Sequence, residues 1–196
     1  MKSSIARAAL LGLAWAALLS GCAGKTETMS YYSLHVPQAS AAAPAGDAVS
    51  VSVGPVTLPD VLKQTRIATG GENGQYRLAE YHRWTGEVDR DMARALAERL
   101  SQSLGTENVS LFPWNRQSRF RVLVDVVAMG GSLGREATLT ARWTLLDTAG
   151  EGAVVRRTDA VQPLPDAEHS SWVAAQQHNV EKLADEIAAA IKAAGN

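Results

Sequence analysis

The spacing of apolar and polar residues along the chain predicts strands in the first half of the sequence. Between residues 49 and 53 valine alternates with serine, and this period of two predicts a half-buried strand. Pro55 and Pro59 have no N–H to donate to a neighbouring strand, so we expect the strand to end there. Residues 29–36 predict a further strand, and residues 66–81 predict two short strands around a glycine-rich turn.

Two later segments repeat their apolar residues every three or four positions, which is typical of amphipathic helices. The first helix is expected from about Gly86, with Thr85 as a candidate N-cap and Gly105 just past its end. The second is expected from about His169 to the end of the chain. The apolar stripes consist of Val88, Met92, Leu96, Leu100 and Leu104 in the first, and of Val173, Val180, Leu183, Ile187 and Ile191 in the second.

The segment between these helices predicts an antiparallel meander. Apolar residues alternate with polar ones in 120–126 and 139–145, and a further strand is expected around 153–162. The connecting segments are short and rich in glycine, as in hairpins. Each strand has one apolar face and each helix one apolar stripe. We therefore predict an α+β fold, with a mixed, mostly antiparallel sheet and two amphipathic helices packed on one face.

The N-terminal segment has the order of a secretory signal. Lys2 and Arg7 precede an apolar run from Ala8 to Leu19, which ends in small residues. The run is shorter than the roughly 20 residues that span a bilayer. Residues 19–22, Leu-Ser-Gly-Cys, contain the single cysteine of the chain and resemble the lipobox of bacterial lipoproteins. The alternative is an ordinary signal in which this cysteine is incidental.

The lipobox resemblance implies cleavage before Cys22 and its modification by diacylglyceryl and N-acyl chains such as palmitate. Residues 1–21 would then be the signal peptide, 22–28 a lipidated tether and 29–196 a single periplasmic domain. Two or three acyl chains hold a protein stably on a membrane. Ala23, in place of an aspartate, implies sorting to the outer membrane. We expect no cofactor besides these covalent lipids.

The composition and the remaining motifs give no support for several other functions. The formal net charge is −1 and no basic run is present, so nucleic-acid binding is not expected. The four histidines, His35, His82, His169 and His178, lack the spacing of a metal site. No nucleophile elbow or phosphate-binding loop is found. We therefore expect a protein that is not an enzyme and binds no metal.

Several stretches of the mature chain carry a resemblance to a known family. "VSVGPV" at 51–56 precedes "LPDVL" at 58–62, and "LAEYHRW" at 78–84 leads into the helix with "RALAERL" at 94–100. In this order, and with "YYSL" after the lipobox, they are similar to the paraquat-inducible protein C (PqiC) family of ABC-type transport auxiliary lipoproteins. The family often has an aromatic residue where this chain has Val61.

The resemblance implies a subunit of a phospholipid-transport complex that supports membrane integrity and contains a mammalian-cell-entry (MCE) domain protein of the inner membrane. The chain would dock this partner from the outer membrane. The oligomeric partners of this class also suggest a ring of several copies. Tyr81, His82, Arg83 and Trp84 are candidate partner-binding residues, since Trp, Tyr and Arg dominate interface hot spots. Packing at the end of the core is the other interpretation of Trp84.

Two other functions stay open from the sequence alone. An envelope lipoprotein that scaffolds or activates cell-wall enzymes would share the anchor and a small α+β domain. A periplasmic hydrolase is the second alternative, and it would have to use residues such as Ser132, His82 and Asp125.

Overall fold

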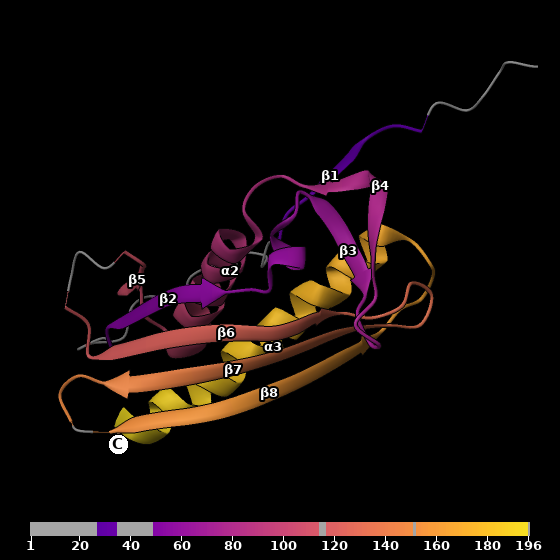
Figure 1. Ribbon diagram of the computed structural model, residues 1–196. Coiled ribbons are helices and arrows are strands. Elements are labelled where there is room, and N and C mark those ends of the chain that lie inside the picture. Colours follow the sequence, from indigo (N-terminus) through magenta and orange to yellow (C-terminus); the bar gives the residue numbers. More distant parts are fainter. Residues whose placement is uncertain (1–26, 35–48, 114–116, 151, 196) are drawn as a thin grey trace, which may run out of the picture.

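The computed structural model describes residues 27–34, 49–113, 117–150 and 152–195 (Figure 1). The strands form a sheet of three strands and a sheet of five. The elements are β1 (Ser30–Tyr32), β2 (Val51–Thr57), the short 3-10 helix η2 (Asp60–Lys63), β3 (Arg66–Gly70), β4 (Tyr76–Trp84), α2 (Val88–Leu104), β5 (Val109–Leu111), β6 (Phe120–Gly130), β7 (Glu136–Asp147), β8 (Ala153–Pro163) and α3 (His169–Gly195).

The larger sheet has the strand order β5-β2-β6-β7-β8. β6, β7 and β8 form the predicted antiparallel meander, in which Val124 lies opposite Trp143. β2 pairs in parallel with both β5 and β6, so the sheet is mixed. The alternating apolar residues that the sequence assigns to one face of β6 and β7 are all buried, namely Phe120, Val122, Val124, Val126, Leu139, Ala141, Trp143 and Leu145.

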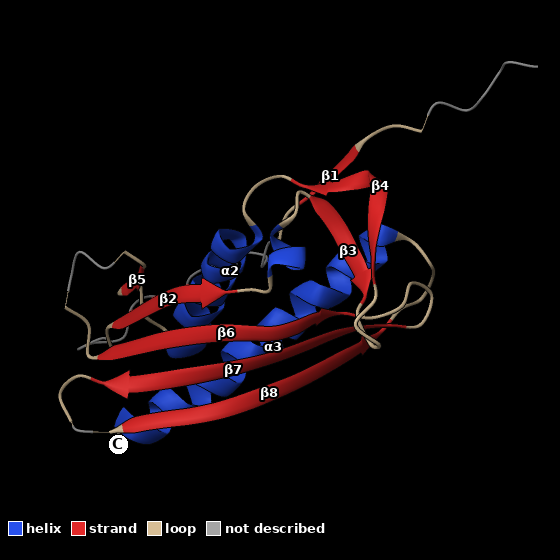
Figure 2. Ribbon diagram, in the orientation of Figure 1, coloured by secondary structure: helices blue, strands red, loops and turns tan. Residues whose placement is uncertain are grey.

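Both long helices lie on the same face of the larger sheet, which confirms the predicted fold class (Figure 2). α2 packs against β2 and against α3, while α3 packs against β7 and β8. An ion pair also connects the two helices. Arg99 of α2 donates from Nε and Nη2 to both carboxylate oxygens of Asp185 of α3, each over 2.8 Å. Two parallel hydrogen bonds of this kind fix the orientation of the two helices.

α2 begins later than the sequence predicts. Thr85 was the candidate N-cap, but the residue at the cap is Glu87. The reason is that the Thr85 N–H donates to the Tyr32 carbonyl over 2.8 Å, so Thr85 is still held by β1. The predicted end is correct. Gly105 adopts the left-handed conformation with φ of 65°, and its N–H donates to the Ser101 carbonyl.

The single predicted sheet is in fact two. β1, β4 and β3 form a separate sheet in the order β1-β4-β3, which we call the small sheet. β1 runs parallel to β4, and β4 extends to Trp84, three residues beyond the expected end of this hairpin. The two sheets meet at Gly70 and Gly131, whose N–H and carbonyl groups bond to each other over 2.7 and 2.9 Å.

β2 also differs from its prediction in length and burial. The strand continues through Pro55 to Thr57. The register of its pairing with β6 shifts between Val53 and Val56, so Pro55, which has no N–H, lies at an irregularity of the strand. Ser52 is 0 % exposed. Its hydroxyl bonds to those of Ser110 and Ser118 over 2.8 and 2.7 Å. The alternation of valine and serine predicts that Ser52 faces solvent, but its hydroxyl is buried and hydrogen bonded to other serines.

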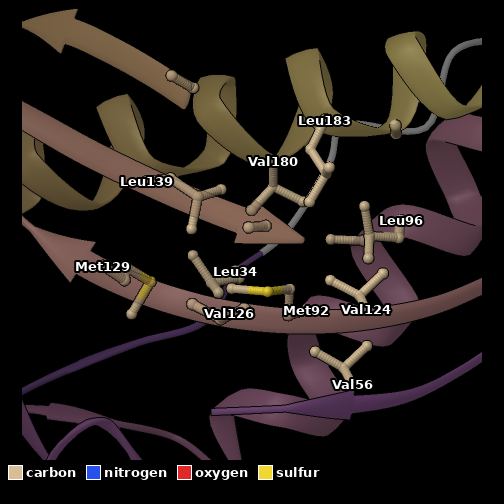
Figure 3. Packing of buried hydrophobic residues seen from close by; sticks show 14 of the residues in the cluster. Leu34, Val56, Met92, Leu96, Val124, Val126, Met129, Leu139, Val180 and Leu183 are labelled. Carbon is tan, nitrogen blue, oxygen red and sulfur yellow. The ribbon is translucent and has the colours of Figure 1, made fainter. Parts of the chain in front are cut away.

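The hydrophobic core lies between the larger sheet and the helices. Leu96 of α2 is 0 % exposed and points into the layer that Val124 of β6 and Leu183 of α3 also fill (Figure 3). Leu104, the last residue of the same stripe, is only half-buried. The two leucines therefore occupy one helix at very different depths.

Leu96→Ala is expected to lower the free energy of unfolding by about 2–5 kcal/mol, because it removes buried methyl groups and leaves a cavity. Urea denaturation followed by circular dichroism measures this change. Leu104→Ala is the matched control, and a smaller loss is expected at this half-buried site. Equal losses at the two positions would contradict the depth that the structure gives them.

Candidate functional site

The four candidate partner-binding residues lie on β4, and the strand divides them between its two faces. Successive side chains of a strand point to opposite sides. Trp84 is 3 % exposed and belongs to the hydrophobic core. His82 points to the same inner side, whereas Tyr81 and Arg83 point outward. The residues therefore do not form one continuous surface, and the burial of Trp84 fits its interpretation as a packing residue.

On the inner side, β4 meets the first turn of α3 through two pairs of rings. His82 stacks on His169, with ring centroids 3.9 Å apart and planes inclined by 14°. Trp84 packs against Trp172, with a centroid distance of 6.4 Å. Tyr32 of β1 completes this cluster, since its hydroxyl and His82 Nδ1 are hydrogen bonded over 2.9 Å. The cluster joins the small sheet to α3.

Protonation of His169 is disfavoured at this junction. Burial and the neighbouring His82 lower the pKa of His169, while the charge of Glu168 acts in the opposite direction. His169 is also the first residue of α3, where the positive end of the helix dipole disfavours an imidazolium. A histidine in the unfolded chain titrates at about 6.5. The folded chain therefore binds fewer protons just below this pH.

The stabilisation from a neutral His169 is complete above about pH 6.5 and is lost as the pH falls through the lower pKa of the folded state. We expect the free energy of unfolding to decrease as the pH falls below about 6.5, by at most about 1.4 kcal/mol per pH unit for one proton. His169→Gln should flatten this dependence in urea titrations. Equal slopes for wild type and His169→Gln would contradict the assignment.

The outer side of the small sheet carries aromatic and cationic side chains. Tyr31 of β1 is 62 % exposed and lies opposite Arg83 in the register of β1 and β4. Arg83 Nε donates to Met29 Sδ over 3.1 Å. The charge of Glu80 and its hydrogen bond to Tyr81 raise the pKa of the Tyr81 phenol, and Glu27 adds to this effect. We call Tyr31, Arg66, Tyr81 and Arg83 the outer face of the small sheet.

The residues that a hydrolase would need are not brought together. Ser132 lies 3.5 Å from Glu72, in the turn after β6. Asp125 accepts from Thr57 over 2.8 Å on the other side of the larger sheet from the helices. His82 is bonded to Tyr32 of β1 and stacked on His169 of α3, away from both of these residues. Within the described residues no three His, Cys, Asp or Glu side chains gather as they would around a metal ion.

An open groove runs along α3 beside β8 and is lined by acidic side chains, including Glu181, Asp185 and Glu186. Asp185 already binds Arg99, whose hydrogen bonds lower the pKa of this carboxyl group, and the Ser103 hydroxyl also donates to it. Glu186 accepts from Thr158, which in turn accepts from Trp143 Nε1. Two of the three carboxylates in this groove therefore hold the fold together.

The predicted signal peptide, Cys22 and the predicted tether up to residue 26 lie outside the described residues, as does His35. The lipidation at Cys22 thus stays a prediction from the sequence. None of the helices that the structure describes is long and apolar enough to cross a bilayer.

The described part of the chain is a small α+β domain built around two packed layers, with distinct inner and outer surfaces at β4. The chain belongs to the family of ABC-type transport auxiliary lipoprotein components, whose model matches residues 32–188. This confirms the resemblance seen in the sequence. The family is a class of transport lipoproteins and not a class of enzymes. No curated protein matches the chain.

Solved structures share the fold at low sequence identity. A crystal structure of an uncharacterized protein is 19 % identical, covers 84 % of this chain and 99 % of its own, and has a TM-score of 0.70. A protein from Xanthomonas campestris, described as a member of family DUF330, is 14 % identical over 83 % of this chain and 93 % of its own, with a TM-score of 0.64. PelC from Paraburkholderia phytofirmans, crystallised as a dodecamer, is 16 % identical over 76 % of this chain and 92 % of its own. Its TM-score is 0.44.

Five residues of this site, Tyr31, Tyr32, Arg66, His169 and Trp172, were not among the candidate partner-binding residues. The alternation within "YYSL" could have shown that Tyr31 and Tyr32 face opposite sides of a strand. Arg66 reaches the site through the pairing of β3 with β4, and His169 through the stacking of its ring on that of His82. Nothing in the local sequence pattern connects either position to β4.

Proposed function

We propose that this lipoprotein is anchored to the outer membrane through acyl chains on Cys22 and docks an MCE-domain protein of a phospholipid-transport complex. The observation that carries the proposal is the match of the transport auxiliary family over residues 32–188, together with the lipobox at residues 19–22. A protein of this family needs no catalytic group for such a task. Its role is to hold a partner at a fixed place in the envelope.

The architecture suits this role. β1 begins at Ser30, eight residues after Cys22, and pairs directly with β4. The acyl chains would fix the tether on the membrane, and several chains together make such an anchor stable. The domain behind the tether is held as one body by the core and by the Arg99–Asp185 pair. A partner that binds this domain is thereby held within a short distance of the membrane.

The test is a crosslinking pull-down of the native lipoprotein from outer-membrane fractions, followed by mass spectrometry. Recovery of an MCE-domain protein is the expected result. The Cys22→Ala chain serves as the control, because it separates partners of the domain from proteins that are co-extracted with lipid. Light scattering on the purified lipoprotein tests in addition whether copies assemble into a ring.

The other outcomes contradict the proposal in different ways. Recovery of cell-wall synthases would favour a lipoprotein that scaffolds or activates those enzymes. Recovery of no specific protein would also reject the transport role, while the fold and the family would stand.

A further inference from the structure

A row of side chains crosses the outer face of the small sheet from strand to strand. Tyr31 of β1 lies opposite Arg83 of β4, and Arg83 lies opposite Arg66 of β3. Residues directly opposite each other on neighbouring strands share a face, with their Cβ atoms about 5 Å apart. Two arginines are therefore direct neighbours on this face.

These two arginines have no acidic partner within the described residues. Neither Arg66 nor Arg83 forms an ion pair there, and the one hydrogen bond of the Arg83 side chain goes to the sulfur of Met29. The nearby Glu80 bonds to Tyr81 instead. Like charges directly opposite each other destabilise a sheet, so an anionic ligand that lies across both guanidinium groups would relieve this repulsion. Guanidinium groups bind phosphate well, because their N–H donors match its oxygen atoms.

A second pair of facing arginines shows that the fold neutralises such pairs elsewhere. Arg142 and Arg157 lie opposite each other on β7 and β8. Arg157 Nε donates to Asp159 over 2.9 Å, and Asp125 of β6 lies opposite Arg142. Neither Arg66 nor Arg83 has such a carboxylate partner within the described residues, since the nearby Glu80 and Glu27 act on Tyr81 instead. Both guanidinium groups are therefore available to an anion from outside the domain.

The position of the small sheet indicates where the anion comes from. Met29 follows Cys22 by seven positions, and seven extended steps of the chain span at most about 25 Å. The first described residues and the labelled C-terminus lie at opposite ends of the domain, and the small sheet lies at the end where the chain enters (Figure 1). An anchor on Cys22 would therefore hold the end of the domain that carries the small sheet within about 25 Å of the membrane.

We propose that the outer face of the small sheet rests on the phospholipid surface, with Arg66 and Arg83 bound to phosphate groups of anionic lipids. Tyr31, 62 % exposed, and Met29, 36 % exposed, enter the interfacial region beside them. Tyrosine is enriched at this depth of a bilayer. The proposal rests on the anchor at Cys22 given under Proposed function. It assigns Tyr81 and Arg83 to the membrane surface rather than to a protein partner.

The experiment uses the acylated full-length protein in vesicles of phosphatidylethanolamine and phosphatidylglycerol, and in vesicles of phosphatidylcholine alone. Cys22 is the single cysteine of the chain and is blocked by lipid, so Tyr81→Cys carries one environment-sensitive fluorophore on the outer face. Val155→Cys on β8 is the matched control, because Val155 is 62 % exposed on a strand of the larger sheet. Quenching by nitroxide-labelled lipids reports which label touches the membrane.

We expect quenching of the label at residue 81 in the phosphatidylglycerol vesicles, and little quenching of the label at residue 155. Each arginine close to an anionic membrane adds to the electrostatic attraction between the domain and the lipids. Arg66→Gln or Arg83→Gln should therefore lower the ratio of docked to undocked domains about 5-fold. The Arg142→Gln/Arg157→Gln pair is the charge-matched control and should have no effect. Raising the salt concentration should weaken docking, because it screens exposed charges.

Three results would overturn the inference. The first is quenching of the label at residue 81 that is equal in neutral and anionic vesicles and is unchanged by the arginine variants. The closeness of the lipid anchor alone would then explain the quenching. The second is a label at residue 81 that stays unquenched, whether or not it crosslinks to a protein in whole membranes. The third is a purified chain whose mass shows no acyl groups. The assay contains no MCE protein, so a failed pull-down leaves this inference standing.

Discussion

A Gly130→Ala substitution is expected to destabilise the whole domain by about 3 kcal/mol or more, because the added methyl group has no space in the folded structure. A Cβ atom on Gly130 would lie 2.0 Å from the carbonyl oxygen of Gly70, which is a backbone atom of the other sheet. The same oxygen accepts the N–H of Gly131. The clash therefore falls at the point where the two sheets are joined.

The backbone at Gly130 cannot turn away from this clash. Its carbonyl oxygen accepts from Trp172 Nε1 over 3.0 Å and from Gln176 Nε2 over 2.9 Å, both on α3. Urea denaturation measures the loss, and Gly152→Ala is the control, because a Cβ atom at Gly152 meets nothing within 4 Å. Similar midpoints for the two variants would show that the sheets can separate here without cost.

Cys22→Ala should move the protein from the membrane to the soluble fraction. Each buried CH₂ of an acyl chain contributes about 0.8 kcal/mol, so the loss of all chains removes the anchor completely. The domain should keep its fold, since its core contains no cysteine. Fractionation with immunoblotting tests the first statement and circular dichroism the second. A variant that still sediments with membranes, with its fold intact, would reject the lipobox.

Much of the architecture could be predicted because the spacing of apolar residues along each segment depends on its secondary structure. The stripe of α2 and the alternation in β6 and β7 each reflect which side of one element is buried. The errors arise where a distant residue decides the outcome. Ser52 is buried because Ser110 and Ser118 supply hydroxyl partners, and Thr85 does not cap α2 because Tyr32 holds its N–H.

The candidate site shows the same division. The sequence draws attention to residues 81–84 through their composition, but composition alone does not say that a strand turns Trp84 inward and Arg83 outward. The pairing of Arg83 with Arg66 depends on a shift of register between Arg66 and Ala68. Such a shift leaves no mark in the sequence, because it results from the way in which two strands fit together.

The parallel pairing of β1 with β4 has a mechanical consequence. The chain enters β1 along the direction of the strand (Figure 1), so a pull from the N-terminal side acts along the row of hydrogen bonds between the two strands. These bonds then share the force instead of opening one after another. Behind them, Leu34 is buried in the core and Gln177 of α3 donates to the Ser33 carbonyl. Tension on the tether is thus passed into the body of the domain rather than peeling its first strand away.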